Sequence, residues 1–90
     1  MEFKGTKDKW NVCSANKTEV NSFNGIAIAE CGMSQMSSLQ EREANAKLIA
    51  AAPELLEALQ DILLVFEERE TAIPVRTQIK IETAINKALK

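Results

Sequence analysis

The feature that most constrains the fold is a long run of apolar side chains at helical spacing in the second half of the chain. They recur every three or four residues, at Ala44, Leu48, Ala51, Ala52, Leu55, Leu59, Ile62, Leu63 and Phe66. This spacing predicts one side of an α-helix. Ser38 and Glu41 form a capping box at its start, with Ser38 accepting a hydrogen bond from the first turn. The stripe predicted to meet the core consists of Ala44, Leu48, Ala51 and Leu55.

Pro53 interrupts this helical run. A proline lacks the amide hydrogen that would bond to the Ile49 carbonyl, and it biases Ala52 away from helical angles. Two helices and one kinked helix both remain open. We favour a break near Ala52, which places Pro53 at the first position of a new helix, with Glu54 and Glu57 complementing its dipole.

The first half of the chain predicts a three-stranded antiparallel meander. Alternating patterns indicate strands within Lys9–Ala15, Thr18–Phe23 and Gly25–Cys31. Asn24 and Gly25 favour a type I′ turn between the second and third strands, because both central residues of that turn have positive φ. Three strands with one apolar face are not stable alone, so the helix is expected to cover them.

A second helix is predicted over Val75–Leu89. Its apolar stripe comprises Gln78, Ile81, Ile85, Ala88 and Leu89, with Val75 and Ile79 beside it. Alternation over Thr77–Ile81 also fits a strand, which leaves that alternative open. The predicted fold is therefore α+β: a single domain over residues 1–90, with a β-meander and loop in 1–37 and a helical hairpin, broken or kinked at Pro53, in 38–90.

Composition excludes several functions. The 90 residues contain no histidine and carry a net charge of −2, so we expect no catalytic residues, no metal, no cofactor and no nucleic-acid partner. The longest apolar run, Ile62–Phe66, is too short to span a membrane, and Met1–Trp10 lacks the apolar segment of a signal peptide. We interpret Cys13 and Cys31 as small core residues in a reducing compartment, with a disulfide as the alternative.

The segment Ile62–Phe66 is apolar all the way round the helix, which exceeds what one small sheet can cover. A symmetric partner subunit is the common way to bury such a surplus. We therefore expect a homo-oligomer formed through the Ala44–Phe66 helical surface. The alternative is that the last helix covers the excess within one chain.

A ligand surface is predicted on a different face of the first helix. With Ala44, Leu48, Ala51 and Leu55 in the core, a turn of about 100° per residue groups Arg42, Asn45 and Ile49 together. Arg42 and Lys47 are candidates for phosphate, Asn45 for a base edge, and Trp10 for stacking. The alternatives are that Arg42 and Asn45 are solvated and that Trp10 anchors the sheet.

The block Glu43–Leu59, EANAKLIAAAPELLEAL, resembles one that recurs in small proteins of tailed bacteriophages and prophages. Trp10, Ile28–Glu30 and Ala84–Ala88 also match positions typical of those proteins, so the resemblance covers most of the chain. It implies a phage accessory protein in the cytoplasm of the bacterial host. The order of sheet and helices is also similar to phage anti-Thoeris sponges, which sequester cyclic-nucleotide immune signals.

The resemblance implies stoichiometric binding and not catalysis. The leading hypothesis is an oligomeric counter-defence protein that sequesters a nucleotide-type signal between its sheet and helices, using Arg42, Asn45, Lys47 and Trp10. The first alternative is an inhibitor that docks its acidic helix end, Glu67–Glu70, or its surplus apolar face on a host protein. The second alternative is a small regulatory protein of the phage.

Overall fold

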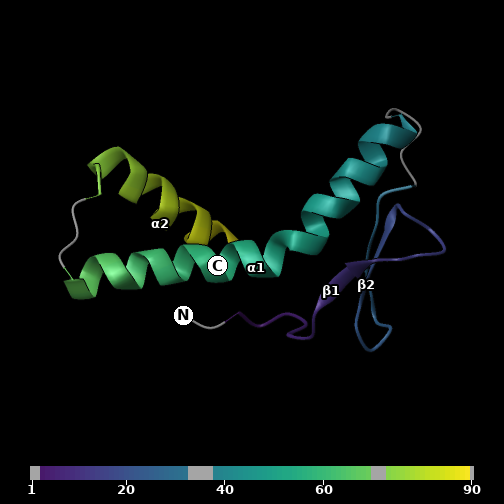
Figure 1. Cartoon of the computed structure of the whole chain (residues 1–90), viewed down its shortest axis with the longest axis horizontal. Helices are drawn as coiled ribbons and strands as arrows, with labels where there is room; N and C mark the ends of the chain where they lie inside the picture. Colours follow the sequence, from purple (N-terminus) through teal and green to yellow (C-terminus); the bar gives the residue numbers. More distant parts are fainter. Residues whose placement is uncertain (1–2, 33–37, 70–72, 90) are drawn as a thin grey trace. The chain divides into compact units, whose positions relative to one another are not determined.

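A computed structural model describes residues 3–32, 38–69 and 73–89 of the chain (Figure 1). Its elements, in order, are β1 (Trp10–Val12), β2 (Glu19–Ser22), β3 (Ala27–Glu30), α1 (Leu39–Arg69) and α2 (Val75–Leu89). The three strands form one antiparallel sheet in the order β1-β2-β3, and two helices follow it. The predicted α+β layout is confirmed, and the strand alternative for Thr77–Ile81 is wrong because this segment is helical.

The chain divides into two compact units, which are described separately. The sheet unit is Thr6–Pro53, and the helical unit is Met1–Gly5 with Glu54–Lys90. The helix α1 contributes its first part to the sheet unit and its second part to the helical unit. It is a single helix that contains Pro53, so the break that we favoured near Ala52 is wrong. The helical ladder on either side continues despite the one hydrogen bond that a proline removes.

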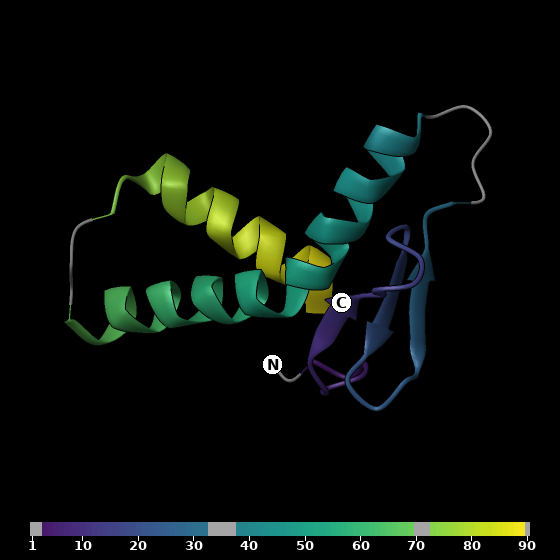
Figure 2. The ribbon, with the colours of Figure 1, turned by 45° about the vertical axis from the view of Figure 1, so that its right-hand side comes forward.

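The sheet is held in register by short antiparallel pairings. Trp10 lies opposite Ser22 and Val12 opposite Val20, while the pairing of β2 with β3 shifts between Val20 and Asn21. Figure 2 shows the three strands side by side, with β2 in the middle. Val20 of the central strand is completely buried. The alternation in the sequence therefore predicted the three strands correctly.

The turn between β2 and β3 differs from the expected type I′ turn. Gly25 N donates to Ser22 O at 2.9 Å, and Ser22 N donates to Ile26 O at 2.8 Å. The loop thus has three residues, Phe23 to Gly25, and Gly25 has a φ of +89°. A three-residue loop of this kind needs a left-handed residue only at its last position, which is where the glycine lies.

The first part of α1 covers the sheet through a side that the sequence analysis did not select. Ala46 is completely buried, whereas Leu48 is 64% exposed. The expected core stripe is therefore wrong: Ala44, Leu48, Ala51 and Leu55 are all exposed. Helical spacing identifies the apolar sides of a helix but does not show which of them is buried, and here the buried side is the one that carries the small Ala46 side chain. Ser38 caps the helix as predicted, because its Oγ accepts from Glu41 N at 3.1 Å.

The helical unit contains the second part of α1 and the whole of α2. The helix α2 returns alongside α1 in the opposite direction (Figures 1 and 2). Its buried side chains are Ile81 and Ile85, two of the five predicted. On α1 the half-buried apolar side chains of this unit are Leu56, Leu59 and Leu63. No helix in the described part of the chain is long and apolar enough to cross a membrane.

Candidate anion-binding pocket

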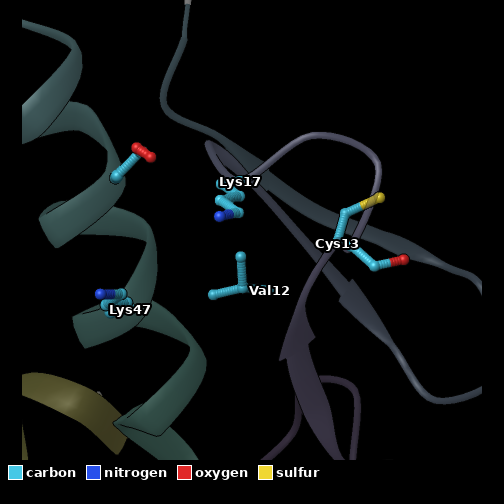
Figure 3. Close-up of a pocket in the computed structure, with 6 residues that line it drawn as sticks. Val12, Cys13, Lys17 and Lys47 are labelled. Carbon is cyan, nitrogen blue, oxygen red and sulfur yellow. The ribbon is translucent and has the colours of Figure 1, made fainter.

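The sheet unit contains an open pocket of about 340 Å³ between the end of β1 and the first part of α1. Its lining residues are Val12, Cys13, Ser14, Lys17, Glu43 and Lys47. Figure 3 shows Lys17 and Val12 on the sheet side and Lys47 on the helix. Two side chains with ammonium groups therefore lie on opposite walls of one pocket.

The sheet side of the pocket is shaped by the connection between β1 and β2. Cys13 N donates to Glu19 O at 2.8 Å, which extends the pairing of the strands beyond Val12. Glu19 N donates to Asn16 O at 3.0 Å, so the chain turns tightly around Lys17. Asn16 Oδ1 accepts from Thr18 N at 3.2 Å, as in an Asx turn. These local bonds fix the position from which Lys17 extends.

The helix side is formed by Glu43 and Lys47, four residues apart. This spacing brings the two side chains to the same face of α1, one turn from each other. Glu43 is half-buried and Lys47 is exposed. With Lys17, the pocket has two cations and one carboxylate, hence a net charge of +1 at neutral pH. A small anion that bridges the two ammonium groups suits this arrangement.

A polar network supports the turn that carries Lys17. Glu30 Oε1 accepts from Thr18 Oγ1 at 2.9 Å and from Gly32 N at 2.6 Å, and Glu30 Oε2 accepts from Asn16 Nδ2 at 3.1 Å. The hydrogen bond from Gly32 N, followed by the one from Thr18, lowers the pKa of the Glu30 carboxyl below its usual value of 4.5. The network ties the end of β3 to the β1–β2 turn, so this carboxylate positions the pocket wall from outside the pocket.

Of the predicted ligand residues, the structure places only Lys47 in the pocket. Arg42 is half-buried and bonds to the backbone, with Nη1 donating to Gly32 O at 3.0 Å. Its Nε donates to Ser38 O at 3.4 Å. Ile49 is also half-buried, so Arg42 and Ile49 lie toward the packed side of α1 and not on a separate face as expected. Asn45 is exposed.

Trp10 is half-buried, and its indole Nε1 donates to Thr6 O at 3.0 Å. It does not line the pocket, and its proposed stacking role stays a prediction. Sequence reasoning missed Lys17. The signal for it was available, because Lys17 is the only basic residue between Trp10 and Arg42 and lies between the first two predicted strands.

The two cysteines are free and half-buried. They flank β2 from opposite sides, since Cys13 N donates to Glu19 O and Cys31 N donates to Thr18 O, both at 2.8 Å. Two strand spacings separate them by about 9–10 Å, beyond the reach of a disulfide. The Cys13 sulfur points away from α1 (Figure 3). Within residues 3–32, 38–69 and 73–89, no cluster of three or more Cys, Asp or Glu side chains is suited to hold a metal ion.

The chain is thus a small α+β protein whose sheet unit contains a pocket lined by two lysines and one carboxylate. A family model described as Salmonella phage P22 protein Y8K6 matches residues 1–90. The chain therefore belongs to this family of phage proteins, and the predicted membership of a phage family is confirmed. No curated protein and no solved structure matches the chain.

Proposed function

We propose that this phage protein is a non-enzymatic accessory protein that binds a small phosphate-bearing ligand of the nucleotide type in the pocket of its sheet unit. By stoichiometric binding it withdraws a cyclic-nucleotide immune signal in the cytoplasm of the host. Membership of a phage family supports this setting. We further propose that it acts as a homo-oligomer through the Ala44–Phe66 surface of α1.

The observation that carries the proposal is the pair Lys17 and Lys47 on two walls of one pocket. A volume of about 340 Å³ lies within the usual range of small-molecule sites. A phosphate placed between the two ammonium groups gains charge-assisted hydrogen bonds from both, each worth about 1.5–3 kcal/mol. Val12 offers an apolar surface for the rest of the ligand. Arg42, Asn45 and Trp10 do not line this pocket. Their predicted roles in ligand binding are therefore secondary to the proposal.

Isothermal titration calorimetry against cyclic dinucleotides, cyclic trinucleotides and ADP-ribose derivatives tests the proposal. We expect binding by at least one of these classes, and an affinity reduced at least about tenfold in K17Q/K47Q, because each lost cation removes a charge-assisted bond. E43Q should raise the affinity a few-fold, because it removes the only carboxylate lining the pocket.

K4Q/K9Q is the matched control, because it removes two exposed lysines outside the pocket. It should leave the affinity unchanged. The absence of binding across the panel at tens of micromolar, or equal losses in K17Q/K47Q and K4Q/K9Q, would overturn the proposal. Chromatography of the ligand recovered after denaturing the complex tests sequestration, which predicts that the ligand is released chemically unchanged.

A second candidate is an inhibitor that docks on a host protein, and exposed apolar side chains favour it. Phe23 is 76% exposed and Ile26 is 55% exposed at the tip of the β2–β3 hairpin. The acidic end Glu67–Glu70, also considered for docking, has side chains outside the described residues. Capture of a host protein from lysate by the wild type, lost in F23S, would favour the inhibitor over a sponge, which needs no protein partner.

A further inference from the structure

The second part of α1 carries large apolar side chains that nothing in the described helical unit covers. Leu55 is 49% exposed, Ile62 is 46% exposed and Val65 is 46% exposed. With the exposed Ala58 they recur at intervals of three and four residues, which places all four within about 80° around the helix. This set is called the α1 stripe. It lies roughly 100° away from the half-buried Leu56, Leu59 and Leu63, which face the body of the unit.

A row of carboxylates borders the α1 stripe on one side. Glu54, Glu57 and Asp61 each directly precede a stripe residue, and all three are exposed. They lie within about 60° of one another around α1. None of them forms an ion pair with a described residue. The three carboxylates therefore border an apolar surface along one side.

The helix α2 carries the complementary charges. Arg76, Lys80 and Lys87 are exposed and lie within about 40° of one another, on the side opposite the buried Ile81 and Ile85. Like the carboxylates, they form no ion pair with a described residue. Next to this row lies a strip of small exposed side chains, formed by Thr77, Ala84 and Ala88. The cations therefore point away from the contact between the helices, so they cannot reach the carboxylates of their own chain.

The charged rows have the same rotational order on both helices. Viewed from each N-terminus, the carboxylates come before the α1 stripe in the clockwise direction, and the cations come before the small strip on α2. When two helices with this same order face each other in antiparallel orientation, their charged rows lie on the same side of the contact and meet. We propose that a second copy of this chain lays its α2 antiparallel on the α1 stripe, with its cations against the first copy's carboxylates.

One twofold axis makes both contacts at once. The α1 stripe lies about 110° from its buried side, and the small strip on α2 lies about 60° from its buried side, in the same rotational direction. The two surfaces therefore face the same side of the helical hairpin. When α1 of the first copy contacts α2 of the partner, the same twofold operation places α2 of the first copy on α1 of the partner. Both contacts form together, so the dimer is closed. Large side chains of α1 then meet small ones of α2, which allows the helices a close approach. This inference specifies the oligomer within the proposed function and does not depend on a ligand.

Charge reversal on each helix tests the pairing without any ligand. We expect the wild type to be a dimer by sedimentation equilibrium at tens of micromolar. E54K/D61K and K80E/K87E should each weaken dimerisation at least about tenfold, because each creates like-charge contacts twice in the symmetric dimer. An equimolar mixture of the two variants should recover a dimer of affinity within a few-fold of wild type, because the mixed pair restores opposite charges in both contacts.

K4E/K9E is the control for K80E/K87E, since it makes the same change of net charge on exposed lysines of the N-terminal segment. It should leave dimerisation unchanged, and circular dichroism should show native helix content in every variant. A wild type that is monomeric at about 100 μM, reversal variants that dimerise as well as wild type, or a mixture that stays monomeric would each overturn the proposal. Loss of ligand binding with an intact dimer, by contrast, would count only against the nucleotide site.

Discussion

The two units of the chain use different means to hold their elements together. In the sheet unit, side chains bond to the backbone at nearly every turn: Asp8 Oδ2 accepts from Asn24 N at 2.7 Å, and Ser22 Oγ accepts from Ile26 N at 3.0 Å. In the helical unit, the described side-chain hydrogen bond is that of Gln78 Nε2 to Glu82 Oε1 at 3.2 Å. The sheet unit has little apolar core, so precise polar contacts specify its turns. The helical unit depends on a few apolar contacts and keeps a large exposed apolar surface.

This difference separates the two proposed roles. A pocket with a fixed pair of lysines needs a wall whose turns are held in one conformation, and the Asn16–Thr18–Glu30–Gly32 network supplies it. An oligomer surface needs apolar side chains that the monomer leaves uncovered, and the α1 stripe has them. Mutations should therefore act through polar geometry in one unit and through apolar burial in the other.

The largest effect is expected for Ile85→Ala in the helical unit. Ile85 is 9% exposed, so its truncation should lower the free energy of unfolding by about 2–4 kcal/mol through lost burial and a cavity. Ile79→Ala is the matched control on the same helix, because Ile79 is 56% exposed. It should cost less than about 0.5 kcal/mol. Urea denaturation followed by circular dichroism measures both, and equal losses would show that α2 has no buried side.

A smaller loss is expected when Ala46 of the sheet unit is enlarged. Ala46 is completely buried, so Ala46→Leu should destabilise the fold by about 1–3 kcal/mol, because a close-packed contact has no room for three more carbons. Ala44→Leu makes the same change two residues earlier on the exposed side of α1 and should be nearly neutral. The pair of variants, measured by urea denaturation, decides which side of α1 covers the sheet. A larger loss for Ala44→Leu than for Ala46→Leu would show that the side containing Ala44 is packed, as expected from the sequence.

The pair Ala44 and Ala46 also shows where sequence reasoning stopped. Periodicity found the strands, both helices and the start of α1 at Ser38, because alternation and capping are local properties. It did not choose the packed side of α1, because both sides contain alanines and aliphatics, and only the tertiary structure decides between them. It also overestimated Pro53, since one missing hydrogen bond does not end a helix that continues on both sides.

The site was harder to predict than the fold. Lys47 was selected from its helix, but its partner Lys17 lies 30 positions earlier in a turn, and only the packing of α1 on the sheet brings the two to one pocket. Arg42 matched the chemistry of a phosphate ligand, yet its guanidinium bonds to the carbonyls of Gly32 and Ser38. Residue type allowed a phosphate ligand to be proposed, whereas the contacts of each side chain depended on tertiary structure.

A moderate effect is expected for Gly32→Ala, which tests the polar network of the sheet unit. A Cβ atom at Gly32 lies 2.7 Å from Glu30 Oε1 and 2.8 Å from Thr18 Oγ1, so the alanine must displace a bonded carboxylate. We expect a measurable loss of stability that is smaller than that of Ala46→Leu, because the bonds to Glu30 are exposed to solvent. Gly25→Ala separates strain from crowding, because Gly25 has a φ of +89° but open space around its Cβ position. Thermal unfolding of both variants checks the expectation, and a neutral Gly32→Ala would show that the network is not rigid.

The smallest effect is the pH dependence that Glu30 contributes. Its hydrogen bonds from Gly32 N, Thr18 and Asn16 favour the ionised form and lower its pKa in the folded protein below 4.5. In the unfolded chain these bonds are absent, so the unfolded state takes up a proton first as the pH falls. The stabilisation is therefore present above about pH 4.5 and is lost as the pH decreases through the folded pKa.

Urea denaturation between pH 7 and pH 3 measures this contribution. The free energy of unfolding should decline less steeply with falling pH for Glu30→Gln than for wild type. Equal slopes for Glu30→Gln and wild type would contradict the assigned role of the network.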